Sequence, residues 1–433
     1  MKLELKNLAK IKDASVGIDG ITVIVGKNST GKSTVGKALF CIFNSLYNVD
    51  NKIKKDRTAN FRRMLWNTFS DSFSYLDDDD MLVEDMFFDL QGTLEKSALE
   101  HDASTIDILK QTLECFANYE QDISEDECVS FSESVLEIIS KVNESSNTQM
   151  TMEILERYFS RVFNNQINSL MTDSVCEISA LIKDKQITIN FDSNKCINVD
   201  APINILHEAF LIDDSTLIDK VEQQKPYRRS ILDSFPQQHL LSAVSVAGND
   251  IDKGIIESIN AKKKLESIYD LLDQTIPGDI STQGKGVSVL LPNYKKPVNV
   301  KNLSTGMKSF ALIKLMLEKG VLKEKDVLIL DEPEVHLHPE WQMKYAEIIV
   351  LLQKYFNLSI VVTTHSSHFL RAVEYYANLH GIRNNCNYYL SKEQEGQCLL
   401  DDVTGDITAI YKELIEPSIM MDDMWYRMES EDE

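Results

Sequence analysis

Residues 26–33 read GKNSTGKS, which matches the phosphate-binding loop pattern G-x-x-x-x-G-K-S at every defined position. The apolar run ITVIV at 21–25 precedes the loop and is typical of a buried parallel strand. Apolar residues then recur at helical spacing, which predicts an amphipathic helix: Val35, Leu39, Ile42, Phe43 and Leu46. A chance glycine turn is the alternative interpretation, but a strand before the loop and a helix after it are the context that phosphate binding requires.

The chemistry of this loop depends on its two glycines and its last two residues. Gly26 and Gly31 let the backbone curl, so that successive N–H groups converge on an anion at the positive end of the following helix dipole. Lys32 would then reach the outer phosphates of a nucleotide, and the Ser33 hydroxyl would coordinate Mg²⁺. The loop therefore predicts a phosphate site that includes a magnesium ion.

Composition places the chain among ordinary globular proteins, with 433 residues, 43% hydrophobic and 26% charged. The net charge of −23 argues against a surface that attracts nucleic acid broadly, although a local basic face can coexist with it. Seven cysteines without a C-x-x-C pair indicate a reducing compartment and no disulfide or zinc framework. The N-terminus has no signal pattern and no run has membrane-spanning length, so we expect a cytoplasmic protein.

A second informative stretch, VLILDE at 327–332, is a buried strand that ends in two carboxylates. Ligands collect at the carboxyl ends of strands in a doubly wound sheet, so these acids should face the phosphate loop. Asp331 would hold Mg²⁺ together with Ser33, and Glu332 would orient or deprotonate an attacking water. Paired acids at a strand end are otherwise caps or surface charges, but the phosphate loop earlier in the chain favours the catalytic interpretation.

Two further motifs flank this strand. Residues 303–306 read LSTG and open an apolar helix, whose N-terminus is a second place where a phosphate could dock. Residues 358–363 read LSIVVT and predict another buried strand, which leads to His365 at the same ligand-collecting edge. An ordinary histidine at a strand end is the alternative interpretation of His365.

The order of these motifs resembles that of the ABC-type ATPases: the phosphate loop, LSTG at 303–306, DEPE at 331–334 and TTHS at 363–366. The stretch DEPEVHLHP at 331–339 is most similar to the branch that includes the RecF, SMC and OLD proteins and the ATPase subunits of bacterial anti-phage systems such as Septu. It is less similar to transporter ATPases. The resemblance covers roughly 1–47 and 205–385.

The resemblance implies a head-to-tail dimer that encloses ATP and Mg²⁺ and hydrolyses the ATP to ADP and phosphate. The triplet Ser304–Gly306 of one subunit would close over the γ-phosphate held by the other, and His365 would sense that phosphate. Lys32, Glu332 and His365 are the predicted catalytic residues, and Ser33 and Asp331 the predicted metal ligands. The predicted nucleotide-binding set is Gly26, Lys27, Asn28, Ser29, Thr30, Gly31, Lys32, Ser33, Thr34, Ser304, Thr305 and Gly306.

The chain departs from the family pattern in two places. The glutamine loop has no secure match, and Gln91 is only a weak candidate for it. Thr305 stands where many members carry glycine or serine. Four histidines have a spacing that would suit a zinc site: His336, His338, His365 and His368. No cysteine lies near them in the sequence, however, and His338 is better explained as the turn into the next helix.

We therefore expect an α/β fold, an ABC-type ATPase head with a mixed sheet and an inserted all-α subdomain. The predicted boundaries are 1–50 and 186–400 for the two parts of the head, 51–185 for the helical insertion and 401–433 for an acidic, mobile tail. Asp19-Gly20 is expected as a hairpin turn between two strands that precede the phosphate loop. We expect no Toprim nuclease domain of the kind that OLD proteins carry at this end, because few residues follow Gly405.

Two charged stretches leave alternatives open. The window 50–63 is the most basic, and it is either a solvated helix face or a contact for DNA or RNA phosphates. The stretch that follows is acidic, but its aspartate run at 77–80 lacks the spaced ligands and the glycine of a calcium loop.

Three functions compete on this evidence. The favoured one is an ATP-gated switch or scaffold that dimerises or assembles further and controls a separately encoded effector protein, such as a nuclease in an anti-phage complex. The second is a RecF-like repair ATPase that binds DNA through the basic window, and the third is a transporter motor. The transporter function fits the sequence least well, because the stretch at 336–339 is unlike that of transporter ATPases.

Overall fold

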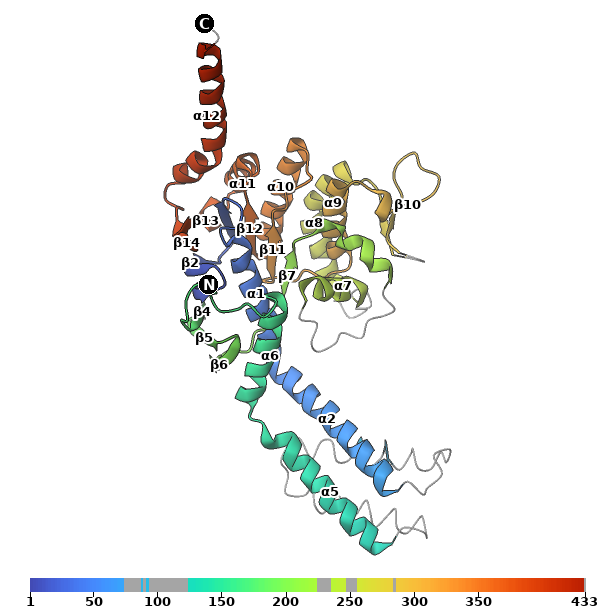
Figure 1. Ribbon diagram of the computed structural model, residues 1–433. Coiled ribbons are helices and arrows are strands. Elements are labelled where there is room, and N and C mark those ends of the chain that lie inside the picture. The colour runs from blue at the N-terminus through green and yellow to red at the C-terminus, as the bar shows by residue number, and fades with distance from the viewer. Residues whose placement is uncertain are drawn as a thin grey trace. The chain divides into compact units, whose positions relative to one another are not determined.

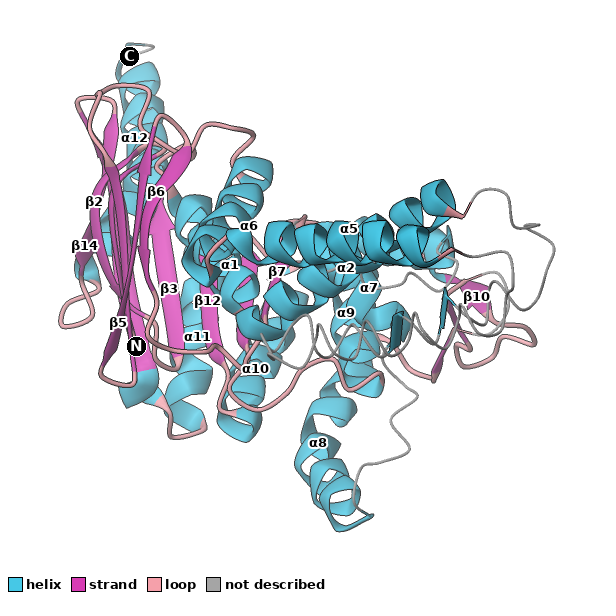
Figure 2. Cartoon of the chain, turned by 90° about the horizontal axis from the view of Figure 1, so that it is seen from below, coloured by secondary structure: helices cyan, strands magenta, loops and turns pink. Residues whose placement is uncertain are grey.

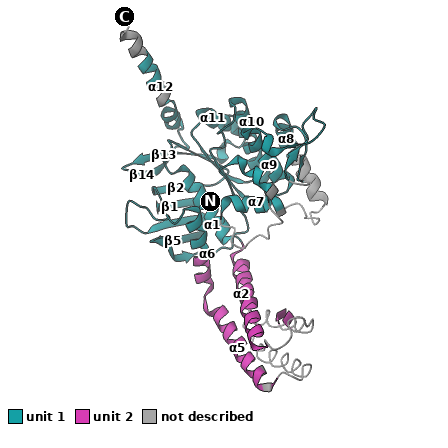
Figure 3. Cartoon of the chain, turned by 45° about the vertical axis from the view of Figure 1, so that its right-hand side comes forward, with its two compact units in different colours: residues 1–47, 154–433 teal, residues 48–153 magenta. Residues whose placement is uncertain are grey.

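The computed structural model describes residues 1–73, 87–88, 91–92, 124–223, 235–246, 255–282 and 286–431. The chain divides into two compact units, which Figure 3 colours separately. The first unit combines 1–47 with 154–433, and the second consists of 48–153.

An 11-stranded mixed sheet forms the centre of the first unit, in the order β6-β5-β4-β1-β2-β14-β13-β3-β12-β11-β7. Its antiparallel half contains β1 (Lys2–Leu8), β2 (Ile11–Gly17), β4 (Cys176–Ile182), β5 (Lys185–Asp192) and β6 (Lys195–Asp200). Its parallel half contains β3 (Ile21–Gly26), β7 (Ala209–Ile212), β11 (Val327–Asp331) and β12 (Ser359–Thr364). The hairpin of β13 (Cys386–Gln394) and β14 (Gln397–Asp402) joins the two halves (Figure 1).

Helices cover both faces of the parallel half, because alternate residues of each strand point to opposite faces. On β11, Ile329 faces α1 (Lys32–Leu46), and a Cβ atom added to Gly36 of that helix would lie 2.6 Å from Ile329 Cγ2. The neighbouring Leu328 and Leu330 belong to the main core on the other face. Three further helices contribute to this core: α9 (Thr305–Glu318), α10 (Pro339–Phe356) and α11 (Ser367–Leu379). Figure 2 shows the strands in magenta and the helices beside them in cyan.

The remaining elements of the first unit surround this core. A 3-stranded sheet is formed by β8 (Ile280–Ser281), β9 (Ser288–Val289) and β10 (Val298–Asn299). The other helices are η1 (Ser215–Gln223), α7 (Pro236–Val246), α8 (Ile255–Thr275), η2 (Val300–Asn302), η3 (Arg383–Asn385) and α12 (Thr408–Glu431). The predicted α/β class with a mixed sheet is thereby confirmed. In place of the expected mobile tail, residues 408–431 form the helix α12.

The N-terminal strands correct one prediction. Residues 1–26 form three strands, and the hairpin joins β1 to β2 rather than β2 to β3. Asp19-Gly20 connects β2 to β3, but β14 and β13 lie between these two strands in the sheet. The expected hairpin turn at Asp19-Gly20 is therefore wrong. The turn residues are present, but the strand before them pairs with β14 and the strand after them pairs with β13, in the distant C-terminal hairpin.

The described part of the second unit is helical. It contains α2 (Val49–Ser72), α5 (Glu125–Glu144) and the start of α6 (Asn147–Val162), and Ser124 caps α5 in a capping box with Glu127. Aromatic residues dominate its own buried core: Phe61, Phe69, Phe73, Phe87 and Phe131, with Leu65, Val135 and Ile138. The unit ends at 153 instead of 185, because α6 continues into the first unit and β4 pairs with β1. The aspartate run at 77–80 lies outside the described residues.

Candidate nucleotide-binding site

The phosphate loop connects β3 to α1, and Gly31 adopts the positive φ of +84° that this turn needs. The buried Lys32 is the first residue of α1, and its Nζ donates to the carbonyls of Gly26 at 2.9 Å and Lys27 at 2.8 Å. Thr30 Oγ1 also donates to the Lys27 carbonyl, at 2.8 Å. The loop is thus closed on itself by its own lysine. Asn28 and Ser29 are exposed, and the Thr34 N–H donates to the Gly31 carbonyl at 3.1 Å.

The predicted metal ligands lie together. Ser33 Oγ, in the first turn of α1, donates a hydrogen bond at 2.9 Å to Asp331 Oδ1, at the end of β11. Thr363 Oγ1, at the end of β12, donates to the same carboxylate oxygen. Sequence reasoning missed Thr363 as a partner of this pair, although the parallel register places Asp331 opposite Thr363.

Glu332 follows Asp331 in a strained backbone conformation with a φ of +49°, which a non-glycine residue rarely adopts. Its N–H donates to both the carbonyl and the Oγ1 of Thr363, each at 3.1 Å, so the turn is held in place. The turn brings Glu332 Oε1 within 3.7 Å of Lys32 Nζ and 3.4 Å of His365 Nδ1. The three predicted catalytic residues are therefore neighbours.

Glu334 is a residue of this site that the sequence analysis did not single out. Its side chain is 3% exposed, and it accepts hydrogen bonds from Thr364 Oγ1 and, at 3.2 Å, from the His365 N–H. Burial raises the pKa of the Glu334 carboxyl above its ordinary value. Glu334 therefore fixes the backbone at His365 relative to the loop after β11.

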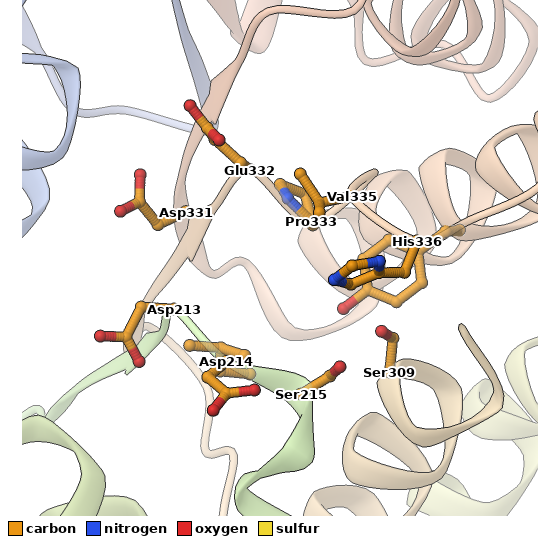
Figure 4. Close-up of a pocket in the computed structure, with 11 residues that line it drawn as sticks. Asp213, Asp214, Ser215, Ser309, Asp331, Glu332, Pro333, Val335 and His336 are labelled. Carbon is orange, nitrogen blue, oxygen red and sulfur yellow. The ribbon is translucent and has the colours of Figure 1, made fainter. Parts of the chain in front are cut away.

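A pocket opens beside these residues, at the carboxyl ends of β7 and β11 (Figure 4). Four carboxylates line it, two from each strand end: Asp213, Asp214, Asp331 and Glu332. Desolvation and the nearby Asp331 carboxylate raise the pKa of Asp213. The sequence carried a signal for Asp213 and Asp214, because these two aspartates follow the apolar run AFLI at 209–212. The same pattern, VLIL followed by two acids, had indicated Asp331 and Glu332.

The predicted signature triplet lies at the start of α9, the helix that contributes Ser309 to the pocket lining. Ser304 caps the helix by accepting a hydrogen bond from the Met307 N–H at 3.3 Å. Ser215 Oγ, from the pocket rim, donates to the Thr305 carbonyl at 3.4 Å. Gly306 lies against the His336 carbonyl. The triplet is thus hydrogen-bonded to Ser215, which follows β7, and Gly306 lies close to the loop after β11.

The four histidines with zinc-like spacing make different contacts. His338 caps α10, where its Nδ1 accepts a hydrogen bond from the Glu340 N–H at 3.4 Å, as the sequence predicted for the turn into this helix. His368 Nε2 lies 3.2 Å from the Pro339 carbonyl, and His365 faces Glu332. His336 lines the pocket with a φ of +70°. Gln91, the weak glutamine-loop candidate, belongs to the second unit.

The residues present fit a magnesium-bound nucleoside triphosphate. A hydroxyl and a carboxylate already converge between Ser33 and Asp331, and oxygen atoms of this kind are the ligands that Mg²⁺ prefers. Lys32 Nζ, bonded to two carbonyls of the loop itself, could exchange these acceptors for phosphate oxygens. Glu332 and His365 stand beside that lysine. This arrangement defines the class of P-loop ATPases.

The family follows from the sequence. Residues 1–370 match the family described as the AAA ATPase domain, and the chain belongs to this family. Among curated proteins, endonuclease GajA from Bacillus cereus (strain HuB5-5) is 23% identical over 402 residues, which cover 86% of this chain and 55% of GajA. The chain thus spans about half the length of GajA. The probable ABC transporter ATP-binding protein p29 from Mesomycoplasma hyorhinis is 24% identical over 207 residues, 46% of this chain and 77% of p29.

Solved structures of SMC heads also match. The SMC head bound to the C-winged helix domain of ScpA has a TM-score of 0.45 at 12% identity and covers 94% of this chain and 98% of that one. The SMC head domain from Thermotoga maritima has a TM-score of 0.38 at 12% identity, with coverage of 93% and 98%. In the part of the chain that the structure describes, no helix combines the length and the apolar character that crossing a membrane requires.

Proposed function

We propose that this chain binds and hydrolyses ATP with Mg²⁺ and acts as a nucleotide-gated switch that controls a separate effector protein. The observation that carries the ATPase proposal is the meeting of Ser33 and Asp331 at 2.9 Å, with Glu332 and Lys32 directly beside them. These residues come from a loop and a strand that are far apart in the sequence. Membership of the AAA ATPase domain family supports the same activity.

Each residue has a defined role in this proposal. Lys32 would bind the outer phosphates, and Ser33 and Asp331 would hold Mg²⁺, which when bound neutralises phosphate charge. Glu332, whose Oε1 lies 3.7 Å from Lys32 Nζ, would accept a proton from the attacking water. His365, held by Glu334 through its backbone, would sense the γ-phosphate.

We further propose that two copies close head to tail over ATP, as in the RecF, SMC and OLD proteins. The triplet Ser304–Gly306 lies against Ser215 and His336 of the pocket lining, whereas Ser33 and Lys32 contact Asp331 and Glu332. A second copy would therefore supply the triplet that closes over the γ-phosphate. ATP can shift the open and closed populations only by its differential affinity for the two states.

The effector in this proposal is a nuclease of a bacterial anti-phage complex, similar to systems such as Septu. Similarity to endonuclease GajA supports a link to nuclease function, although this chain covers only 55% of GajA. A surface for a protein partner is offered by the outer half of α12, whose apolar side chains are exposed: Ile419, Met420, Met421, Met424 and Trp425. Met420 and Met424 are four residues apart, as are Met421 and Trp425, so the members of each pair are neighbours on the helix surface.

The test compares wild type with Lys32→Ala, using Lys37→Ala on the same helix as the matched control. Wild type and control should hydrolyse ATP and gain mass in light scattering when ATP and Mg²⁺ are added, whereas Lys32→Ala should do neither. Absence of ATP binding in the wild type would overturn the proposal. Hydrolysis without ATP-dependent self-association would overturn the dimer and leave the ATPase.

A second candidate function, direct DNA binding of the RecF kind, is favoured by one observation in the second unit. The helix α2 buries Ile53, Phe61, Leu65 and Phe69. It exposes four basic side chains and an aromatic one: Lys54, Lys55, Arg62, Arg63 and Trp66. Basic residues interleaved with an exposed aromatic suit phosphates and stacked bases. DNA affinity should then fall with salt, and neutralising Lys54, Lys55, Arg62 and Arg63 should reduce the salt slope. Equal affinity of the variant would exclude this function.

A further inference from the structure

The phosphate loop is connected to the C-terminal helix by a pair of ionic contacts. Lys27, the second residue of the loop, lies with its Nζ 3.1 Å from Glu413 Oε1 and 3.3 Å from Glu416 Oε2. Hydrogen bonds to these two carboxylates raise the pKa of Lys27. Glu413 and Glu416 are three residues apart and therefore lie on one face of α12.

The base of α12 is fixed to the first unit, so these carboxylates are held near the loop. Ile410 is fully buried, and Leu414 packs against the main core. Tyr411 donates a hydrogen bond from its hydroxyl to Glu374 of α11 at 3.1 Å. A flexible tail would offer Lys27 only a transient counterion, whereas this helix presents two carboxylates from an anchored turn.

Lys27 is also held through its backbone. Its carbonyl accepts the hydrogen bond from Lys32 Nζ at 2.8 Å, and Lys32 is the residue that would bind phosphate. Incoming phosphate must compete with this carbonyl for Lys32. The α12 carboxylates neutralise the Lys27 side chain and hold in place the residue whose carbonyl engages Lys32.

The negative charges of Glu413 and Glu416 also oppose nucleotide binding directly. Two negative charges beside an anion-binding loop repel a triphosphate, and they also occupy a lysine that could attract it. Exposed ion pairs contribute little to folding stability. Their effect here falls on ligand affinity, because the ligand carries several negative charges and binds to the same loop.

We propose that Glu413 and Glu416 are affinity-determining residues of the nucleotide site, which restrain the phosphate loop through Lys27. This inference rests on the proposed ATP binding and adds its regulation. Displacement of α12, for example by a protein that engages its exposed outer half, frees Lys27 and increases the affinity for ATP. Figure 1 shows that this outer half stands clear of the sheet, while its base lies beside it.

The experiment measures binding of a non-hydrolysable ATP analogue with Mg²⁺ by titration calorimetry. Glu413→Gln/Glu416→Gln should lower the Kd about three- to tenfold at low salt, with a smaller change at 0.5 M salt. The matched control is Asp422→Asn/Asp423→Asn, which removes the same charge from exposed positions farther along α12. This control should leave the Kd unchanged. Circular dichroism verifies that both variants keep the helix.

Two outcomes overturn the inference while leaving the proposed function intact: an unchanged Kd in the glutamine variant, or an equal decrease in both variants. A double-mutant cycle with Lys27→Met gives a further criterion. The decrease in Kd should shrink when Lys27 is absent, and a decrease of the same size with and without Lys27 contradicts the role of this residue. A wild-type chain that does not bind the analogue at all overturns both proposals.

Discussion

The hydroxyl of Ser33 donates a hydrogen bond to the carboxylate of Asp331 at 2.9 Å, although 298 residues separate them in the sequence. The contact exists because β3, β12 and β11 are parallel neighbours, so the loop after β3 and the end of β11 meet at one edge of the sheet. Thr363, at the end of the strand between them, donates to the same carboxylate. The first turn of α1 and the ends of β11 and β12 thus supply oxygen atoms to one point.

This geometry predicts the effect of removing the Ser33 hydroxyl. Ser33→Ala should raise the Mg²⁺ concentration for half-maximal ATP hydrolysis by about tenfold or more, since one oxygen ligand is lost. A magnesium titration of the ATPase rate measures the change. Ser45→Ala is the control, because the Ser45 hydroxyl lies farther along α1 and donates to the Ile42 carbonyl. If Ser33→Ala and the control require the same Mg²⁺ concentration, Ser33 is not a metal ligand.

Replacing Glu332 should separate ATP binding from ATP hydrolysis. Glu332→Gln keeps the size of the side chain but cannot accept a proton, so the hydrolysis rate should fall by a factor of about 10²–10⁴. ATP binding should persist, and the closed dimer should accumulate in light scattering. The control Glu340→Gln changes an exposed glutamate in the first turn of α10. Hydrolysis by Glu332→Gln at the wild-type rate would show that another group activates the water.

Local patterns were enough to predict the centre of the site. The run at 21–26 and the run at 327–331 are continuous and apolar because each strand is buried on both faces, and each ends in residues with ligand chemistry. The same reasoning, applied to the edge strand β7 and the two acids that follow it, could have identified Asp213.

Long-range pairing could not be predicted in the same way. The strand β4 reads CEISALI, with a weak alternation that resembles the preceding helical stretch, and only its pairing with β1 shows that it belongs to the head. The contacts of Glu334 with Thr364 and of Lys27 with Glu413 depend on how distant elements meet. A single sequence carries no local signal for such contacts.

The aromatic core of the second unit gives a prediction about its stability. Phe131 is 1% exposed and contacts Phe69 and Phe73, so Phe131→Ala should destabilise this unit by about 3–5 kcal/mol. Phe88→Ala removes the same side chain from a position that is 62% exposed and should cost much less. Hydrogen exchange of the full chain measures the difference. Faster exchange confined to 48–153 in Phe131→Ala is expected, and equal exchange in the two variants would contradict a buried role for Phe131.

The buried Asp326, just before β11, predicts a pH dependence of folding. Burial raises its pKa to about 6, although its carboxylate accepts hydrogen bonds from the N–H groups of Lys323 at 2.8 Å and Glu208 at 3.2 Å. In the unfolded chain this group titrates near 4, so between about pH 4 and pH 6 the folded protein keeps a proton that the unfolded chain loses. Its contribution to stability is therefore full below pH 4 and is lost as the pH rises through 6. The loss amounts to about 3 kcal/mol.

The measurement compares urea unfolding of wild type and Asp326→Asn from pH 4 to pH 7. The difference between their free energies of unfolding should change by about 3 kcal/mol across this window, with the wild type losing stability relative to the variant as the pH rises. Both proteins also carry His207, whose Nδ1 lies 3.8 Å from Asp326 Oδ1 and whose pKa is lowered by burial. Repeating the pair in a His207→Gln background removes its titration. If the difference between the two free energies of unfolding does not change with pH in that background, Asp326 ionises normally, and burial at the start of β11 does not disfavour its charge.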